Sequence, residues 1–425
     1  MSDGLAPGAQ TSRRRWTAAV VVTIGYFSIR ALNFWELWFA SSAQAASGPA
    51  NPLGNPSDYF VQTPTPASPG LGGLLTNWDG QWYERIAVDG YPTGAEARSA
   101  NDAWTWAFPP LFPMLVRLVM ALTGLGFPAA SVVLNLVLGG VATALLYCLL
   151  RASLSGTLAT AGALSLSVFM SAPLFGLAYS EPAALVLLLV ALRATLAQRY
   201  TAGLLAVILL AFTRPVAVPL AAVFAVHWWL RWRSRRTAQL GPGTHLILAA
   251  NTLAAMASPF LWNAIATVCF GSAASPAEQS DSPLSGVART ASMISTFEFG
   301  WLGGVWRIAG TAGVLLVILV AGLALGLAVT TSGRLGLPIE LRVWGVTYTA
   351  FVLLVTPPTP GLIRYLLLAA PLLIAVHVQP LAWRKRAAGL VLFGVITAVG
   401  LWSQWFWIRY LYILDPAPAQ LPWPP

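Results

Sequence analysis

Residues 108–126 read FPPLFPMLVRLVMALTGLG, and the placement of this stretch relative to a membrane decides the topology of the whole chain. The apolar run within it contains Arg117 and is short compared with the roughly 20 residues that a helix needs to cross a hydrocarbon core. A helix of this kind can lie along the membrane surface instead. We therefore predict an interfacial helix at about 109–124, within an external loop.

The composition of the chain is that of a helical membrane protein. Apolar residues make up 57% of the 425 residues and charged residues 9%, against about 25% charged residues in soluble proteins. Many apolar runs are long enough to span a bilayer, and spanning segments of this length must be helices because backbone groups need partners within the lipid. A transmembrane β-barrel would instead show short alternating segments.

With the interfacial helix set aside, the apolar runs predict about eleven membrane spans. The first covers 16–40, and the others cover 128–150, 154–172, 181–198, 201–213, 215–231, 244–270, 304–330, 340–356, 362–380 and 387–408. The predicted class is thus an all-α polytopic membrane protein.

The basic residues support this register. They fall in or beside the connections that this count places in the cytoplasm, and nearly every acidic residue falls outside. The basic positions are Arg151, Arg193, Arg199, 231–236, Arg334, Arg342 and 384–386. Counting 109–124 as a span would invert half of them, against the positive-inside rule. We expect a multi-pass protein of the cell membrane with a cytoplasmic N-terminus.

Three regions follow from this topology. Residues 1–15 form a cytoplasmic segment, 16–408 the membrane domain and 409–425 an external Pro-rich tail. The first run could pass for a signal peptide, but it is long and lacks a cleavage-like boundary, so we interpret it as a retained helix.

Two loop features add to this picture. The first external loop, about 41–127, opens with a Pro/Gly/Ser/Ala-rich stretch, Ser41–Gly73, that is expected to be poorly ordered. The sequence Thr213-Arg214-Pro215 separates two short spans, which form either a helical hairpin or one kinked helix. Arg199 and Arg231 bracket the pair, which favours the hairpin.

The net charge of +10 does not indicate a nucleic-acid partner, because the basic residues are dispersed at helix ends. Neither cysteine nor histidine spacing resembles a metal site, and no acidic cluster has the pattern of a cation site. We expect no cofactor and no metal.

Residues 77–92 read NWDGQWYERIAVDGYP and hold three of the 14 acidic residues of the chain. Asp79 could be a helix cap or a solvated loop residue, but Trp82 stands where a capping box has Glu or Gln. It could equally be a general base that takes a proton from an acceptor hydroxyl. Trp78 and Trp82 are four apart, so a helix would place them on one face, as an interfacial anchor or as a platform for sugar or lipid.

Glu181 is the second candidate carboxylate. Ser180 and Pro182 suit the start of a helix, where Glu181 would meet the helix dipole. A carboxylate at the membrane boundary near Asp79 could also help to bind an acceptor.

Three arginines are candidate phosphate ligands. Arg30 lies inside the first span, where a charged group either has a function or extends to the membrane surface. Arg214 and Arg364 fall at outer ends of later spans. A planar guanidinium matches phosphate geometry, although contact with lipid headgroups or a topological role would also explain both residues.

Several motifs together resemble the PIG-V family, which comprises the second mannosyltransferase of GPI-anchor assembly and its bacterial relatives, within the GT-C membrane glycosyltransferases. The resemblance covers roughly 16–220. Its motifs are Trp78-Asp79-Gly80, Tyr83, Ile86-Ala87, Gly90-Tyr91, 108–113 and Tyr179-Ser180-Glu181, with Arg364-Tyr365-Leu366 and Pro371 further on. The chain departs from the family in its Pro/Ala/Gly-rich early loop and in Ala107-Phe108, where a phenylalanine pair is usual.

The resemblance implies a GT-C-type fold and transfer of a hexose, with mannose as the expected sugar, from a polyprenyl-phosphate donor to a lipid- or protein-linked acceptor. Asp79 would be the catalytic base, with Glu181 orienting the acceptor. Arg364 would stabilise the leaving phosphate, with Arg30 or Arg214 as alternatives. The motif aromatics Trp78, Trp82, Tyr83 and Tyr179 are expected to line the substrate site.

Two other functions fit a polytopic protein. A lipid or sugar transporter without covalent chemistry would show broken helices and charges near the mid-membrane, whereas here the acids gather at one face. A polysaccharide polymerase or ligase would commonly have a long late loop, and residues 271–303 form one of only moderate length.

Overall fold

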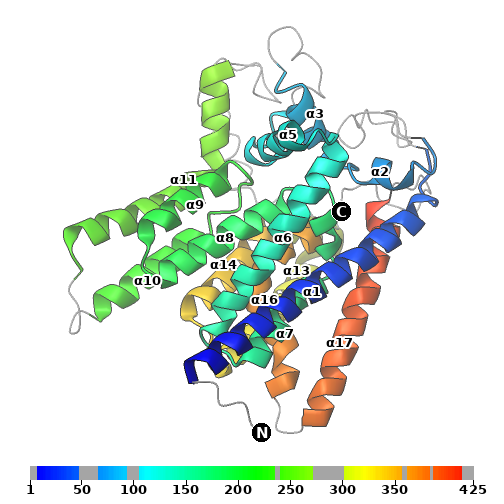
Figure 1. The fold of residues 1–425 in the computed structure, drawn as a ribbon. Coiled ribbons are helices and arrows are strands. Elements are labelled where there is room, and N and C mark those ends of the chain that lie inside the picture. Colours follow the sequence, from blue (N-terminus) through cyan, green and yellow to red (C-terminus); the bar gives the residue numbers. More distant parts are fainter. Residues whose placement is uncertain are drawn as a thin grey trace.

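The computed structural model describes residues 7–46, 66–92, 105–234, 240–270, 301–356, 361–382 and 386–413. Every regular element in these ranges is a helix (Figure 1), so the all-α prediction is confirmed there. Four helices are long and apolar enough to cross a membrane, in agreement with the predicted class. They are α6 (Phe127–Arg151), α11 (Pro242–Phe270), α13 (Trp301–Arg334) and α17 (Arg386–Trp407).

Each of the other predicted spans also contains a helix. These are α1 (Pro7–Ser41), α7 (Gly156–Ser167), α8 (Glu181–Leu196), α9 (Tyr200–Ala211), α10 (Leu220–Arg233), α14 (Ile339–Val355), α15 (Gly361–Leu366) and α16 (Ala370–Val378). Residues 212–219 between α9 and α10 are not helical, so this pair is not one kinked helix.

The predicted span 154–172 was wrong at its C-terminal end, 168–172. Helix α7 ends at Ser167, and turns lead into a short 3-10 helix, η2 (Ala172–Gly176). Pro173 lies at the start of η2, and a proline cannot continue an α-helix without losing a backbone hydrogen bond. The chain after Ser167 therefore presents backbone carbonyls that need partners from other helices.

Helix α13 shows the surface expected of a membrane helix. Its apolar side chains are largely exposed, for example Ile308 at 83% and Leu323 at 65%. A soluble protein rarely leaves so large an apolar surface in water. This surface is suited to contact with lipid chains.

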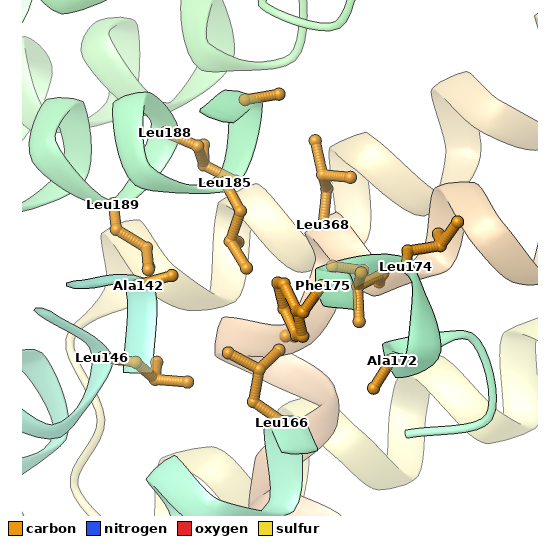
Figure 2. Packing of buried hydrophobic residues seen from close by; sticks show 14 of the residues in the cluster. Ala142, Leu146, Leu166, Ala172, Leu174, Phe175, Leu185, Leu188, Leu189 and Leu368 are labelled. Atoms are coloured by element: carbon orange, nitrogen blue, oxygen red, sulfur yellow. The ribbon is translucent and has the colours of Figure 1, made fainter. Parts of the chain in front are cut away.

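The main core lies where α6, α7, α8 and η4 (Leu367–Ala369) meet. Figure 2 shows Phe175 of η2 among Leu166, Leu185 and Leu368, which come from three of these elements. All four side chains are fully or almost fully buried. Since η2 is packed on all sides, the turn that follows it, which leads to Glu181, is held in one position.

Three short helices gather at one end of the bundle: α2 (Gly70–Leu74), α3 (Asp79–Val88) and α5 (Leu111–Thr123) (Figure 1). The predicted helix at 109–124 is thus present as α5, which packs against α3 and α6. Its 13 residues give a length of roughly 20 Å, less than the roughly 30 Å of a hydrocarbon core. Gly124 ends it in the left-handed conformation, with φ 73°.

Two boundary predictions need correction. The stretch Ser41–Gly73 is not irregular throughout, because Ser41 belongs to α1 and α2 begins at Gly70, while 47–65 lie outside the described residues. The external tail was predicted to start at 409, but the helix continues through a π-helical turn, Ile408–Tyr412, in which Tyr412 is fully buried. Residues 414–425 lie outside the described part.

Candidate functional site: a buried chain of four charges

The backbone at Trp78 sets the position of Asp79. Trp78 has φ 60° and ψ −118°, a conformation that a bulky residue rarely adopts. Its indole nitrogen donates a hydrogen bond of 2.7 Å to the carbonyl oxygen of Tyr412, which holds it there. Asp79 follows as the first residue of α3. The rare backbone conformation at the start of α3 therefore depends on packing against the end of the last helix.

Gly80 allows α3 to approach the segment before α8. A Cβ at Gly80 would lie 3.2 Å from the Cβ of Ala178, closer than usual contacts. The amide of Ala178 also donates to the carbonyl oxygen of Leu75 at 3.0 Å. A residue with a side chain at position 80 would push Asp79 away from Glu181, which gives the Trp-Asp-Gly motif a steric reason.

Helix α6 also holds the segment that precedes α8. The amide nitrogen of the Asn135 side chain donates to the carbonyl oxygens of Leu177 and Tyr179, the latter at 2.8 Å. These two bonds orient the turn that leads into Ser180 and Glu181. Asn135 was not predicted as a site residue, although a polar side chain in an apolar span is a recognised signal.

The expected cap of α8 does not form. Ser180 precedes the helix, but its hydroxyl makes no capping bond. It accepts a hydrogen bond from Arg214 Nη1 at 3.2 Å and lies 2.7 Å from the hydroxyl of Tyr83. Burial raises the pKa of Tyr83 above its usual value, so its hydroxyl stays protonated and can donate. Ser180 thus links α3 to the segment between α9 and α10.

Four charged side chains form a continuous chain of ion pairs. Arg364 Nη1 lies 2.9 Å from Asp79 Oδ2, and Arg364 Nε lies 3.0 Å from Glu181 Oε1. Arg214 Nη1 lies 2.9 Å from the same oxygen of Glu181. The order is Asp79–Arg364–Glu181–Arg214, and the two positive and two negative charges balance.

Burial differs along this chain. The Glu181 side chain is 0% exposed and that of Arg364 is 4% exposed, while that of Arg214 keeps 11% and that of Asp79 keeps 14%. Asp79 and Arg214 are therefore the more exposed members of this chain of charges. Burying charges costs free energy unless they are paired, and the arrangement satisfies this condition.

The pairing leaves hydrogen-bonding capacity unused. Within the described part of the chain, Nε and Nη1 of Arg364, both oxygens of Glu181 and the hydroxyl of Tyr179 have no well-aligned hydrogen-bond partner. The nitrogen and oxygen atoms of these ion pairs lie close together, but the N–H groups do not point at the oxygens as a hydrogen bond requires. Unsatisfied buried polar atoms are uncommon in proteins, and a polar ligand that approached this cluster could satisfy them.

Aromatic rings enclose the guanidinium groups. The Arg364 guanidinium carbon lies 5.2 Å from the ring centre of Tyr179 and 4.9 Å from that of Tyr365. Arg214 lies 5.2 Å from the same Tyr365 ring, and the Tyr365 hydroxyl accepts a hydrogen bond from Arg364 Nη2 at 3.0 Å. Cation–π contacts of this kind orient a guanidinium. Tyr365 was not predicted as a site residue, although it adjoins Arg364 in the sequence.

The two tryptophans are neither exposed anchors nor an open platform. Trp78 is 7% and Trp82 2% exposed. Trp82 stacks on Phe108 with ring centres 5.9 Å apart. The two do not share a helix face, because Trp78 precedes the first residue of α3. The prediction of a shared face was wrong, since it assumed helical geometry from position 78.

Arg30 lies apart from this cluster. Its guanidinium donates to the carbonyl oxygens of Ala172 and Ser167, in the break after α7. Gln404 Nε2 also donates to the Ser167 carbonyl oxygen, at 2.8 Å. Arg30 is 2% exposed, so it does not extend to the membrane surface. It supplies hydrogen-bond donors to carbonyl oxygens that have no helical partner in this break. The structure does not bring it to Asp79.

Among the described residues, no three histidine, cysteine, aspartate or glutamate side chains come together as metal ligands. The comparisons with known proteins add no assignment, since neither a protein-family model nor a curated protein matches the chain. The functional reading therefore depends on the charge cluster and on the motifs that build it.

Proposed function

We propose that the chain is a membrane glycosyltransferase that moves a hexose, with mannose as the expected sugar, from a polyprenyl-phosphate donor to an acceptor hydroxyl. The observation that supports this most directly is the Asp79–Arg364–Glu181–Arg214 chain. It combines a partly exposed carboxylate with two guanidiniums, and two nitrogens of Arg364 lack a well-aligned hydrogen-bond partner. A base beside a phosphate site is what such a transfer requires.

The proposed topology has eleven membrane crossings, a GT-C-type arrangement and the charge cluster on the extracytoplasmic side. Helix α8 begins at Glu181 and carries Arg193 near its other end. Its 16 residues span roughly 24 Å. The positive-inside rule then assigns the Arg193 end to the cytoplasm.

The donor phosphate competes with Asp79 for Arg364. In the structure Arg364 Nη1 contacts Asp79. A phosphate that binds Nη1 replaces Asp79 as its partner and gives this nitrogen an aligned acceptor, while Nε keeps its contact with Glu181. Asp79 is then released next to the bound sugar. Donor binding and activation of the base are one event in this mechanism.

The transfer is a single displacement. The acceptor oxygen forms a bond to the anomeric carbon, and its proton moves to a carboxylate oxygen of Asp79. The bond between the anomeric carbon and the phosphate oxygen breaks, and the prenyl phosphate leaves with the electron pair. Arg364 and Arg214 stabilise the negative charge that develops on it. The configuration at the anomeric carbon inverts.

Glu181 takes a different role here from the acceptor-orienting role that the sequence suggested. It is fully buried and contacts both arginines. We assign it the positioning of Arg364 and Arg214, which both contact its Oε1 oxygen. The aromatic rings of Tyr179 and Tyr365 keep the guanidinium planes in place.

The test is transfer by purified protein in vitro. Polyprenyl-phosphate mannose is compared with the glucose and arabinose counterparts, and a total lipid extract supplies the acceptor. We expect a mannosylated product and release of prenyl phosphate. Movement of the intact donor across a liposome membrane without any product would contradict the proposal and support a transporter.

A further inference from the structure

A cavity of about 500 Å³ lies at the far end of α6 from the charge cluster. Asn135 of α6 contacts the turn before Glu181, whereas Arg151, the last residue of α6, lines the cavity. The intervening stretch of helix is roughly 24 Å long. The cavity is thus a separate site, and nothing in the proposed transfer uses it.

Two arginines from different helices line this cavity. Arg151 ends α6, and Arg193 lies in the last turn of α8. Arg151 Nη1 donates to the carbonyl oxygen of Leu154 at 3.0 Å, which restrains its guanidinium. Neither arginine forms an ion pair with a carboxylate of the described residues. Their positive charge is left for an external anion.

The other walls combine polar and apolar groups. Thr23 of α1 and Tyr147 of α6 bring hydroxyl groups, while Val22 and Ala144 bring apolar surface. Ile24 of α1 and Val141 of α6, which are close in sequence to lining residues, are exposed apolar side chains. A molecule that fills the cavity therefore meets positive charge, hydroxyl groups and apolar helix surface.

We propose that this cavity binds one anionic phospholipid. Its phosphate lies between Arg151 and Arg193, and an acyl chain runs along Val22 and Ala144. Guanidinium groups match phosphate geometry, and basic pockets between membrane helices bind anionic headgroups. A soluble phosphate compound would leave the apolar wall uncovered. The lipid ties α1, α6 and α8 together at this end.

Cys148 provides a direct probe, because it lines the cavity and its thiol is exposed and not in a disulfide. The chain has only two cysteines, so Cys269→Ser leaves Cys148 as the single thiol. The measurement is the rate of maleimide modification in detergent, with added phosphatidylglycerol or phosphatidylcholine. We expect phosphatidylglycerol to slow modification and phosphatidylcholine to leave the rate unchanged.

Variants identify the ligands. In Arg151→Gln/Arg193→Gln, half-protection should need about thirty times more phosphatidylglycerol, since each arginine near an anionic surface contributes about a factor of five. Arg199→Gln is the matched control, because Arg199 is an exposed arginine at the start of α9 that does not line the cavity. It should keep full protection.

Four results would overturn the proposal. They are equal protection by phosphatidylcholine, protection by inorganic phosphate alone, undiminished protection in the double variant, and no protection by phosphatidylglycerol in the parent protein. A thermal unfolding curve that matches the parent shows that each variant is folded. None of these outcomes depends on glycosyl transfer.

Discussion

Arg364 Nη1 lies 2.9 Å from Oδ2 of Asp79. The carboxylate that we propose as the base is therefore held by the cation that we propose as the phosphate ligand. The Oδ2 oxygen of Asp79 faces this guanidinium until another partner takes its place. In the proposed mechanism the donor phosphate breaks this pair, and the following predictions test that arrangement.

Asp79→Asn should leave the protein folded and membrane-inserted but lower transfer from prenyl-phosphate mannose by about a hundredfold or more, because a carboxamide cannot accept the proton. The measurement is the initial rate of product formation. Asp89→Asn is the control, since Asp89 is an exposed acid at the end of the same helix. Full activity of Asp79→Asn would remove Asp79 from the role of base.

Arg364→Ala should raise the KM for the prenyl-phosphate donor, by about ten- to a hundredfold for a lost charge-assisted contact, and leave the KM for the acceptor nearly unchanged. Arg364→Lys keeps one positive charge and serves where the alanine variant does not fold. Its single ammonium group cannot reproduce contacts made through two separate guanidinium nitrogens. A change confined to the acceptor KM would contradict the phosphate assignment.

Glu181→Gln should lower the free energy of unfolding by about 3 kcal/mol, because two buried arginines lose a shared negative charge. The measurement is denaturant unfolding in detergent, followed by tryptophan fluorescence. Glu84→Gln is the comparison, since Glu84 is a half-buried acid of α3 and belongs to none of the three ion pairs of the cluster. Equal stability of the two variants would show that Glu181 is not needed to hold the arginines.

Arg30→Met should lower the free energy of unfolding by about 2 kcal/mol, because the buried carbonyl of Ala172 loses its side-chain donor. The KM for the lipid donor should stay unchanged in the folded fraction. The two readouts separate a structural role from a substrate-binding one. A raised donor KM at unaltered stability would return Arg30 to the substrate site.

Much of the architecture could be predicted from short stretches of the sequence. Apolar runs gave helices at each predicted span, and the short run with Arg117 gave α5 at the end of the bundle. The failures have physical causes. The helix in 154–172 stops at Ser167, before Pro173. The backbone at Trp78 is not helical, so Trp78 and Trp82 do not share a helix face.

The candidate site could be predicted by residue type and position, but not by its contacts. The sequence alone determined that the chain is helical and apolar, and that Asp79, Glu181, Arg214 and Arg364 are charges in unusual places, because hydropathy and helix signals are properties of neighbouring residues. Only the tertiary structure decided that Arg364 lies between the two carboxylates and that Arg30 instead supports a broken helix. Ion pairs between distant segments depend on how the helices pack, and this packing depends on contacts between residues that are far apart in the sequence.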